Sequence, residues 1–257
     1  MIQPLPRDPR SGLVLLLLLG LAACGGEGDG TPAADATEAP LMSDVAQGPH
    51  NTLSEAERSE GWQLLFDGAS TEAWRTYGAD DLHDGWQAVD GTLVRVDGGG
   101  DIITRETYAD FELKVDWMVL EGGNSGIFIR ASEESGRIFE GAPEVQVLDD
   151  AVHADGANPL TSAGANYAIH PAPRGVVRPA GEWNEARVRV EGNRVQQWLN
   201  GVEIVDYELG SPEWTALVAA SKFAEWPEYG TYATGHIGLQ DHGDRVSFRN
   251  LKVRRIP

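Results

Sequence analysis

Short segments of alternating apolar and polar residues, separated by turn sequences, recur along most of this chain. Alternation with a period of two is typical of a β-strand that buries one face. Three of the breaks are two-residue hairpin turns, at Asp90-Gly91, Gly192-Asn193 and Asn200-Gly201. Strands are expected at residues 86–89, 92–95, 101–104, 110–119, 125–129, 144–148, 183–191, 194–199, 202–207, 235–240 and 246–253. So many strands, with no long helical pattern between them, predict an all-β antiparallel sandwich.

The N-terminal segment has the features of an export signal. Arg7 and Arg10 precede an apolar run at residues 13–19, and Leu21-Ala22-Ala23 leads to Cys24, the only cysteine. The run is shorter than the roughly 20 residues of a membrane span. This segment resembles the lipobox of bacterial lipoproteins, which predicts a signal peptide over 1–23 and a lipid on Cys24. An ordinary secretory signal is the alternative. The mature chain is then expected in the bacterial cell envelope, lipid-anchored and facing the periplasm or the outer membrane.

The remainder divides into a tether and one domain. Residues 25–50 contain five acids, three prolines and no Lys or Arg, a composition that favours a flexible segment over 24–51. A capping box of Thr52 and Glu55 predicts that a short helix opens a domain spanning 52–257. The sequence GWQLLFDG at 61–68 predicts a further strand. Residues 149–180 and 208–234 are expected to be long loops, which are usually functional.

Charge and motifs exclude several function classes. The chain has 40 acidic residues against 20 Lys and Arg, a net charge of -20, which disfavours nucleic acid as a partner. It contains no phosphate-binding glycine loop and no GxSxG sequence. His153, His170 and His236 lack the spacing of zinc ligands.

Three strands carry polar residues on the face that does not point into the core. Alternation places two residues of each strand on that face: Phe128 and Arg130, Glu144 and Gln146, Gln240 and His242. If these strands are neighbours, the side chains share one surface, where polar groups beside an aromatic ring suit a sugar. Simpler interpretations are an ion pair between Glu144 and Arg130, a solvated strand face, and turn capping by Asp149 and Asp150.

A family resemblance extends over about residues 52–257. The segments GWQLLFDG, GNSGIFIRA, PEVQVLDD, PAGEWNEARVRVEGNRVQQWLNGVEIVDY and HIGLQDHGDRVSFRNLKVRRI together resemble the 3-keto-disaccharide hydrolase family. The resemblance implies a concanavalin A-like jelly roll of two antiparallel sheets, with a concave face that receives the sugar. Enzymes and binding modules share that fold, so the fold alone does not decide the activity.

The chemistry implied by the resemblance starts from a glycoside already oxidised at C3 by a separate dehydrogenase. A base removes the acidified C2 proton, the C1 substituent is eliminated, and water adds back. Glu144 and His242 are the candidates for proton transfer, with their roles as acid and base unassigned. Asn124, Arg130, Gln146 and Gln240 would position the substrate, and Lys222 would add a positive charge. No cofactor is required. The sequence leaves open whether a divalent metal assists enolisation, with Glu144, Asp149 and His242 as candidate ligands.

Two other functions compete with this one. A carbohydrate-binding module would use the same face without turnover. An ordinary glycosidase would need two carboxylates flanking one bond, and the ExDxxE signature of glucanases with this fold is absent, because Gln146 stands where an Asp is required.

Overall fold

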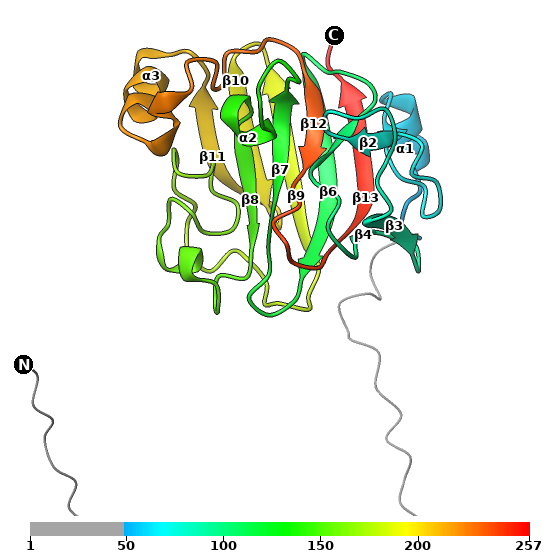
Figure 1. Ribbon diagram of the computed structural model, residues 1–257. Coiled ribbons are helices and arrows are strands. Elements are labelled where there is room, and N and C mark those ends of the chain that lie inside the picture. The colour runs from blue at the N-terminus through cyan, green and yellow to red at the C-terminus, as the bar shows by residue number, and fades with distance from the viewer. Residues whose placement is uncertain (1–48) are drawn as a thin grey trace, which may run out of the picture. The chain divides into compact units, whose positions relative to one another are not determined.

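The computed structural model describes residues 49–257 as two antiparallel sheets that pack face to face (Figure 1). The large sheet contains β1 (Gln63–Leu64), β3 (Trp86–Val89), β4 (Thr92–Arg95), β6 (Phe111–Val119), β9 (Asn184–Glu191), β10 (Arg194–Leu199), β11 (Val202–Glu208) and β13 (Val246–Arg255). The small sheet contains β2 (Trp74–Thr76), β5 (Ile102–Thr104), β7 (Asn124–Ala131), β8 (Glu144–Leu148) and β12 (His236–Leu239). The predicted antiparallel β-sandwich is confirmed. The predicted signal peptide, Cys24 and most of the predicted tether lie outside the described residues.

The strand order explains how distant parts of the sequence come together. The small sheet runs β2-β5-β12-β7-β8, so β12, the second-last strand of the chain, is inserted between β5 and β7. In the large sheet, β13 lies between β6 and β4. Figure 1 shows the small sheet in front, with the short helix α2 (Ile138–Gly141) lying over it.

Alternation along the strands builds the core between the sheets. The inward positions of β6 are all apolar and buried, from Phe111 to Val119. The small sheet contributes Ile127 and Ile129 from β7 and Val145 and Val147 from β8. The opposite face of the small sheet is therefore free to carry polar groups.

The predicted hairpin turns join the expected strands. Asp90 and Gly91 link β3 to β4, and both have positive φ, at 48° and 75°. Asn200 and Gly201 link β10 to β11 with φ of 50° and 81°. Positive φ at both central residues is the requirement of a type I′ turn, which explains the Asp-Gly and Asn-Gly sequences.

The start of the domain differs from the prediction. The capping residue of α1 (Glu55–Ser59) is Ser54, whose hydroxyl accepts from the backbone N–H of Glu57 at 3.1 Å, while Glu57 accepts from the backbone of Ser54 at 2.9 Å. Thr52 instead donates to a backbone carbonyl before the helix. The two capping sequences overlap, so the pattern alone does not identify the correct one. The strand expected at 61–68 is limited to β1.

Asn51, which the prediction placed in the tether, is part of the folded domain. Its backbone N–H donates to Oδ1 of Asn250 at 2.7 Å, and its own Oδ1 accepts from the backbone of Asn250 at 2.8 Å. Its Nδ2 donates to the carbonyl of Gly91. The side chain is buried, so the ordered fold begins before residue 52.

The segments expected to be long loops contain short helices. Residues 149–180 include the 3-10 helix η1 (Ala154–Ala157), and residues 208–234 include α3 (Pro212–Ala219) and the 3-10 helix η2 (Lys222–Glu225). Ser211 caps α3 with its hydroxyl, and Pro212 occupies the first helical position. This Ser-Pro pair is a recognisable start signal, although the helix behind it is only eight residues long. Within 49–257 no helix has the length and apolar character of a membrane span.

Candidate active site

The outer face of the small sheet carries the polar residues that alternation placed there. In the register of β7 and β8, Gly126 lies opposite Gln146 and Phe128 lies opposite Glu144. The backbone N–H of Gln240 donates to the carbonyl of Gly126 at 2.9 Å, so Gln240 lies beside the same row. The prediction that Glu144, Gln146 and Gln240 share one face is confirmed. Phe128 is fully buried under α2 and does not form an open aromatic platform.

A pocket of about 230 Å³ lies over this row of residues. It contains six of the seven predicted site residues, together with four side chains from neighbouring segments. The lining residues are Asp101, Asn124, Phe139, Glu144, Gln146, Tyr167, Lys222, Gln240, Asp241 and His242. The volume is below the roughly 300–1,000 Å³ of pockets that take drug-sized ligands, which suits a ligand as small as a single sugar ring.

Glu144 is the most buried acid of the pocket. It is 5% exposed, and its carboxylate bends over Gly126, where an added Cβ would lie only 2.8 Å from Cδ and 2.9 Å from Cγ of Glu144. Burial raises the pKa of Glu144 to about 8, although the charge of Lys222 and a hydrogen bond from Gln240 act against the rise. At neutral pH Glu144 is therefore mostly protonated and can donate a proton.

Three amide oxygens around Glu144 are buried without a partner. Within the described residues, Oδ1 of Asn124 and Oε1 of Gln146 and Gln240 accept no hydrogen bond. An unpaired buried polar atom costs about 1–3 kcal/mol. Hydroxyl groups of a bound ligand could donate hydrogen bonds to all three oxygens. The pocket is therefore suited to a molecule with several O–H donors.

Arg130, also predicted to line this face, lies elsewhere. Its φ is +50°, and the register between β7 and β12 shifts at this point, between His236 and Gly238. Such a bulge redirects side chains, so the alternation that holds as far as Phe128 fails two residues later. The prediction that Arg130 joins the other site residues is therefore not supported by the structure.

Arg130 instead links β7 to the residues before β6 and to the turn between β9 and β10 in the large sheet. Its guanidinium donates to the carbonyls of Ala109 at 2.9 Å and Gly192 at 2.7 Å, and lies 3.3 Å from the carboxylate of Asp110. With these partners it forms no ion pair with Glu144. The alternative interpretation of a pair between these two residues is wrong as well.

Comparison with known proteins identifies the family. Residues 61–254 match the model of the 3-keto-alpha-glucoside-1,2-lyase-like domain. The chain belongs to this family. It is also 33% identical to the 3-keto-disaccharide hydrolase of Bacteroides thetaiotaomicron over 274 aligned residues, which cover 91% of this chain and 93% of that protein.

Solved structures agree with the assignment. A glycosyl hydrolase from Parabacteroides distasonis is 33% identical, with a TM-score of 0.76, covering 81% of this chain and 100% of its own. A second glycosyl hydrolase from that organism is 29% identical, with a TM-score of 0.59, covering 76% and 99%. This family member is therefore a carbohydrate-active enzyme of the hydrolase or lyase type, which decides against a binding module without turnover.

Lys222 brings positive charge to the rim of the pocket. It lies in η2, within the region predicted only as a loop, and its Nζ lies 4.2 Å from the centre of the Tyr167 ring. Burial lowers its pKa, while the charges of Glu144 and Asp155 act in the opposite direction. Lys222 can therefore stabilise negative charge that develops above Glu144.

His242 lies at the exposed rim, on the loop between β12 and β13. Two contacts hold this loop against β7. The hydroxyl of Ser125 donates to the carbonyl of Gln240 at 2.8 Å, and Asp244 accepts from the backbone of Asn124 at 3.2 Å. The imidazole is thus in contact with both the pocket and the solvent.

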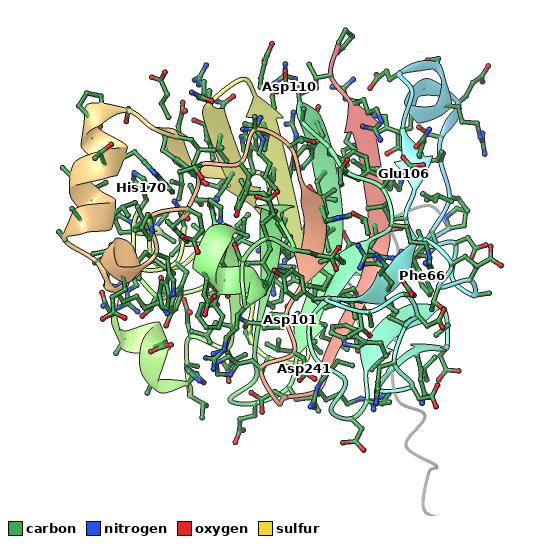
Figure 2. All side chains as sticks on the ribbon, turned by 45° about the horizontal axis from the view of Figure 1, so that its top comes forward. Phe66, Asp101, Glu106, Asp110, His170 and Asp241 are labelled. Carbon is green, nitrogen blue, oxygen red and sulfur yellow. The ribbon has the colours of Figure 1, made fainter. Side chains whose placement is uncertain are left out.

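Four pocket residues were not predicted from the sequence: Asp101, Phe139, Tyr167 and Asp241. Tyr167 and Phe139 belong to irregular segments where no alternation can be read. Asp101 directly precedes β5, and alternation across Ile102 and Ile103 would have placed it on the outer face. Figure 2 shows Asp101 and Asp241 close together.

The candidate metal ligands do not gather in one place. Asp149 caps a turn, accepting from the backbone N–H groups of Gly122 at 2.8 Å and Ala151 at 3.1 Å, which agrees with its alternative interpretation as a turn cap. Within 49–257 no three His, Cys, Asp or Glu side chains form a group that could hold a metal ion. His236 contacts the carbonyl of Thr104, and His153 caps η1.

Proposed function

We propose that this enzyme cleaves 3-keto-glycosides, including 3-keto-disaccharides, by elimination across C1 and C2 followed by addition of water. The observation that carries the proposal is the buried carboxyl group of Glu144, surrounded by three unpartnered amide oxygens in a pocket of sugar size. Family membership and the names of the relatives support the substrate class.

The reaction begins with the substrate's own ketone. The carbonyl at C3 acidifies the C2 proton, and its removal gives an enolate. The C1–C2 double bond then forms as the C1–O bond breaks, and the leaving oxygen takes a proton. This step also re-forms the C3 carbonyl, so the product is an enone. Water next adds its oxygen to C1 while a proton returns to C2, which saturates the C1–C2 bond and completes a net hydrolysis. The ketone accepts the electrons of the C2–H bond, so the route requires no redox cofactor.

The role of each pocket residue in this reaction follows from its position and its charge. Glu144, protonated at neutral pH, donates to the leaving oxygen. His242, at the rim, lies where the water that adds to C1 enters the pocket. Lys222 stabilises the negative charge of the enolate, and Asn124, Gln146 and Gln240 accept hydrogen bonds from the sugar hydroxyls.

The pKa of Glu144 predicts the alkaline limit of activity. Its pKa is raised to about 8, so the donating form is present below that pH and is lost as the pH rises through it. We expect kcat/KM for a 3-keto-glycoside with a poor leaving group to fall above about pH 8. A rate profile measured from neutral to alkaline pH checks this, and a profile that rises steadily beyond pH 8 contradicts the role of Glu144 as the acid.

The experiment that tests the proposed function is incubation of the purified protein with 3-keto-trehalose, with unoxidised trehalose as the matched control. We expect release of glucose from the 3-keto sugar and none from trehalose, because only the ketone acidifies the C2 proton. Cleavage of both sugars at similar rates would instead support an ordinary glycosidase, and cleavage of neither contradicts the proposal.

We also propose that the protein works in the cell envelope. The support is the sequence before the domain, where the signal-like residues 1–23 end at Cys24. Export with a lipid on Cys24 would leave the domain on an acidic tether outside the cytoplasm. Its substrate must come from a dehydrogenase that oxidises glycosides at C3, because the enzyme itself carries out no oxidation in this route.

A further inference from the structure

Asp101 lies on the same row of the small sheet as the amide groups of the pocket. The register of β5 and β12 pairs Ile103 with Gly238 and Ile102 with Leu239. One step further along this register, Asp101 lies opposite Gln240. The row across the sheet is therefore Asp101 on the β5 side, Gln240 after β12, Gly126 on β7 and Gln146 on β8.

Asp101 and Glu144 approach this row from opposite sides. Their strands, β5 and β8, are separated by β12 and β7, a backbone separation of about 14 Å at the usual strand spacing. Glu144 spans one of these spacings by bending over Gly126. The two carboxyl groups therefore lie on either side of Gln240, and both line the same pocket.

The neighbours of Asp101 hold it in place. Its Oδ1 accepts from the backbone N–H of Asp241 at 2.9 Å. Asp241 is fixed in turn, since its carboxylate lies 2.6 Å from Arg95 and accepts from the backbone N–H groups of Gly99 and Gly100. Among the described residues, Oδ2 of Asp101 has no hydrogen-bond partner, so this oxygen is available to a ligand.

The two carboxyl groups differ in protonation. Burial raises the pKa of Asp101 to about 6, helped by the charge of Asp241 and opposed by the backbone hydrogen bond. Burial raises the pKa of Glu144 further, to about 8. Between these values Asp101 is mainly a carboxylate and Glu144 mainly a neutral acid. Two groups whose environments separate their pKa values in this way suit a base and an acid in one reaction.

We propose that Asp101 is the catalytic base that removes the C2 proton, and that Glu144 across the pocket is its acid partner. The assignment rests on the proposed function. In the elimination, Asp101 takes the C2 proton and Glu144 gives its proton to the leaving oxygen. In the hydration, Glu144 takes a proton from the attacking water and Asp101 returns its proton to C2. Both groups end the cycle in their starting states.

A purely structural role for Asp101 makes a different prediction. The one hydrogen bond of its side chain within the protein needs only an acceptor oxygen, and Asn keeps that oxygen. Asp101→Asn is therefore expected to fold with an unchanged melting temperature. If Asp101 only positions the loop, this variant stays active; if it is the base, the variant loses proton removal.

The test separates proton removal from elimination. The 3-keto derivative of 1,5-anhydroglucitol keeps the ketone and the C2 proton but has no exocyclic substituent to expel at C1. In D₂O, nuclear magnetic resonance follows the exchange of its C2 proton. We expect exchange with the wild-type protein, a loss of about 100-fold or more in Asp101→Asn, and near wild-type exchange in Glu144→Gln, because no leaving group needs an acid.

The matched control is Asp97→Asn, in an exposed residue of the same loop whose carboxylate contacts only its own neighbour, Gly98. This variant should exchange at the wild-type rate. Wild-type exchange in Asp101→Asn would overturn the assignment and leave the proposed function standing, provided that the wild type exchanges. Failure of the wild type itself to exchange the C2 proton would overturn the proposed function and the assignment together.

Discussion

Glu144→Gln is expected to lower kcat on 3-keto-trehalose by about 1,000-fold, within the range typical of a lost general acid. The amide keeps the shape and the burial of the carboxyl group but cannot give a proton to the departing sugar oxygen. Steady-state kinetics with detection of released glucose measures the loss. The control is Glu121→Gln, an exposed residue outside the pocket, which should retain wild-type rates.

The leaving group provides a sharper check on the role of Glu144. A 3-keto-glucoside of 4-nitrophenol expels a phenolate that needs little protonation. We therefore expect Glu144→Gln to cleave this substrate far closer to the wild-type rate than it cleaves 3-keto-trehalose. Equal losses on both substrates would contradict a role as acid to the leaving oxygen, and no loss on either would remove Glu144 from the mechanism.

Gly126→Ala is expected to reduce kcat by about 100-fold without preventing folding. The new methyl group would occupy the space where the Glu144 side chain bends, 2.8 Å from its Cδ. The flexible end of Glu144 can move away, but a displacement of about 1 Å in a reacting group can cost about 100-fold in rate. Kinetics on 3-keto-trehalose, together with thermal unfolding, would separate misplacement of the carboxyl from loss of structure.

The matched control for this substitution is Gly98→Ala. Gly98 has open space around it within 4 Å, so the added methyl group should leave both kcat and the unfolding temperature unchanged. If Gly126→Ala retains the wild-type kcat, the position of the Glu144 carboxyl over Gly126 does not matter for catalysis. That result would remove the geometric basis of the acid role.

Sequence patterns predicted the site best where strands are regular. Glu144, Gln146 and Gln240 share a face because β-strand alternation has a period of two, and their strands keep that period. Arg130 follows the same pattern in the sequence. Its own positive φ and the shifted register between β7 and β12 turn its side chain away from the pocket. Alternation alone contains no signal for such a bulge.

Residues outside regular strands were harder to predict. Tyr167 and Phe139 reach the pocket from a loop and a four-residue helix, where position depends on tertiary contacts. Asp101 could have been found, since it extends the alternation of β5, but the pairing of β5 with the distant β12 is not encoded locally. The hairpins, by contrast, follow from Asp-Gly and Asn-Gly sequences whose backbone conformation is restricted.

The central claim is cleavage through removal of the C2 proton, and the most direct measurement compares 3-keto-trehalose with the same sugar carrying deuterium at C2. Breaking a C–D bond is slower than breaking a C–H bond, so the account predicts slower cleavage of the deuterated sugar by the wild-type protein. Equal rates for the two substrates, at a pH where the chemical step limits turnover, would contradict it.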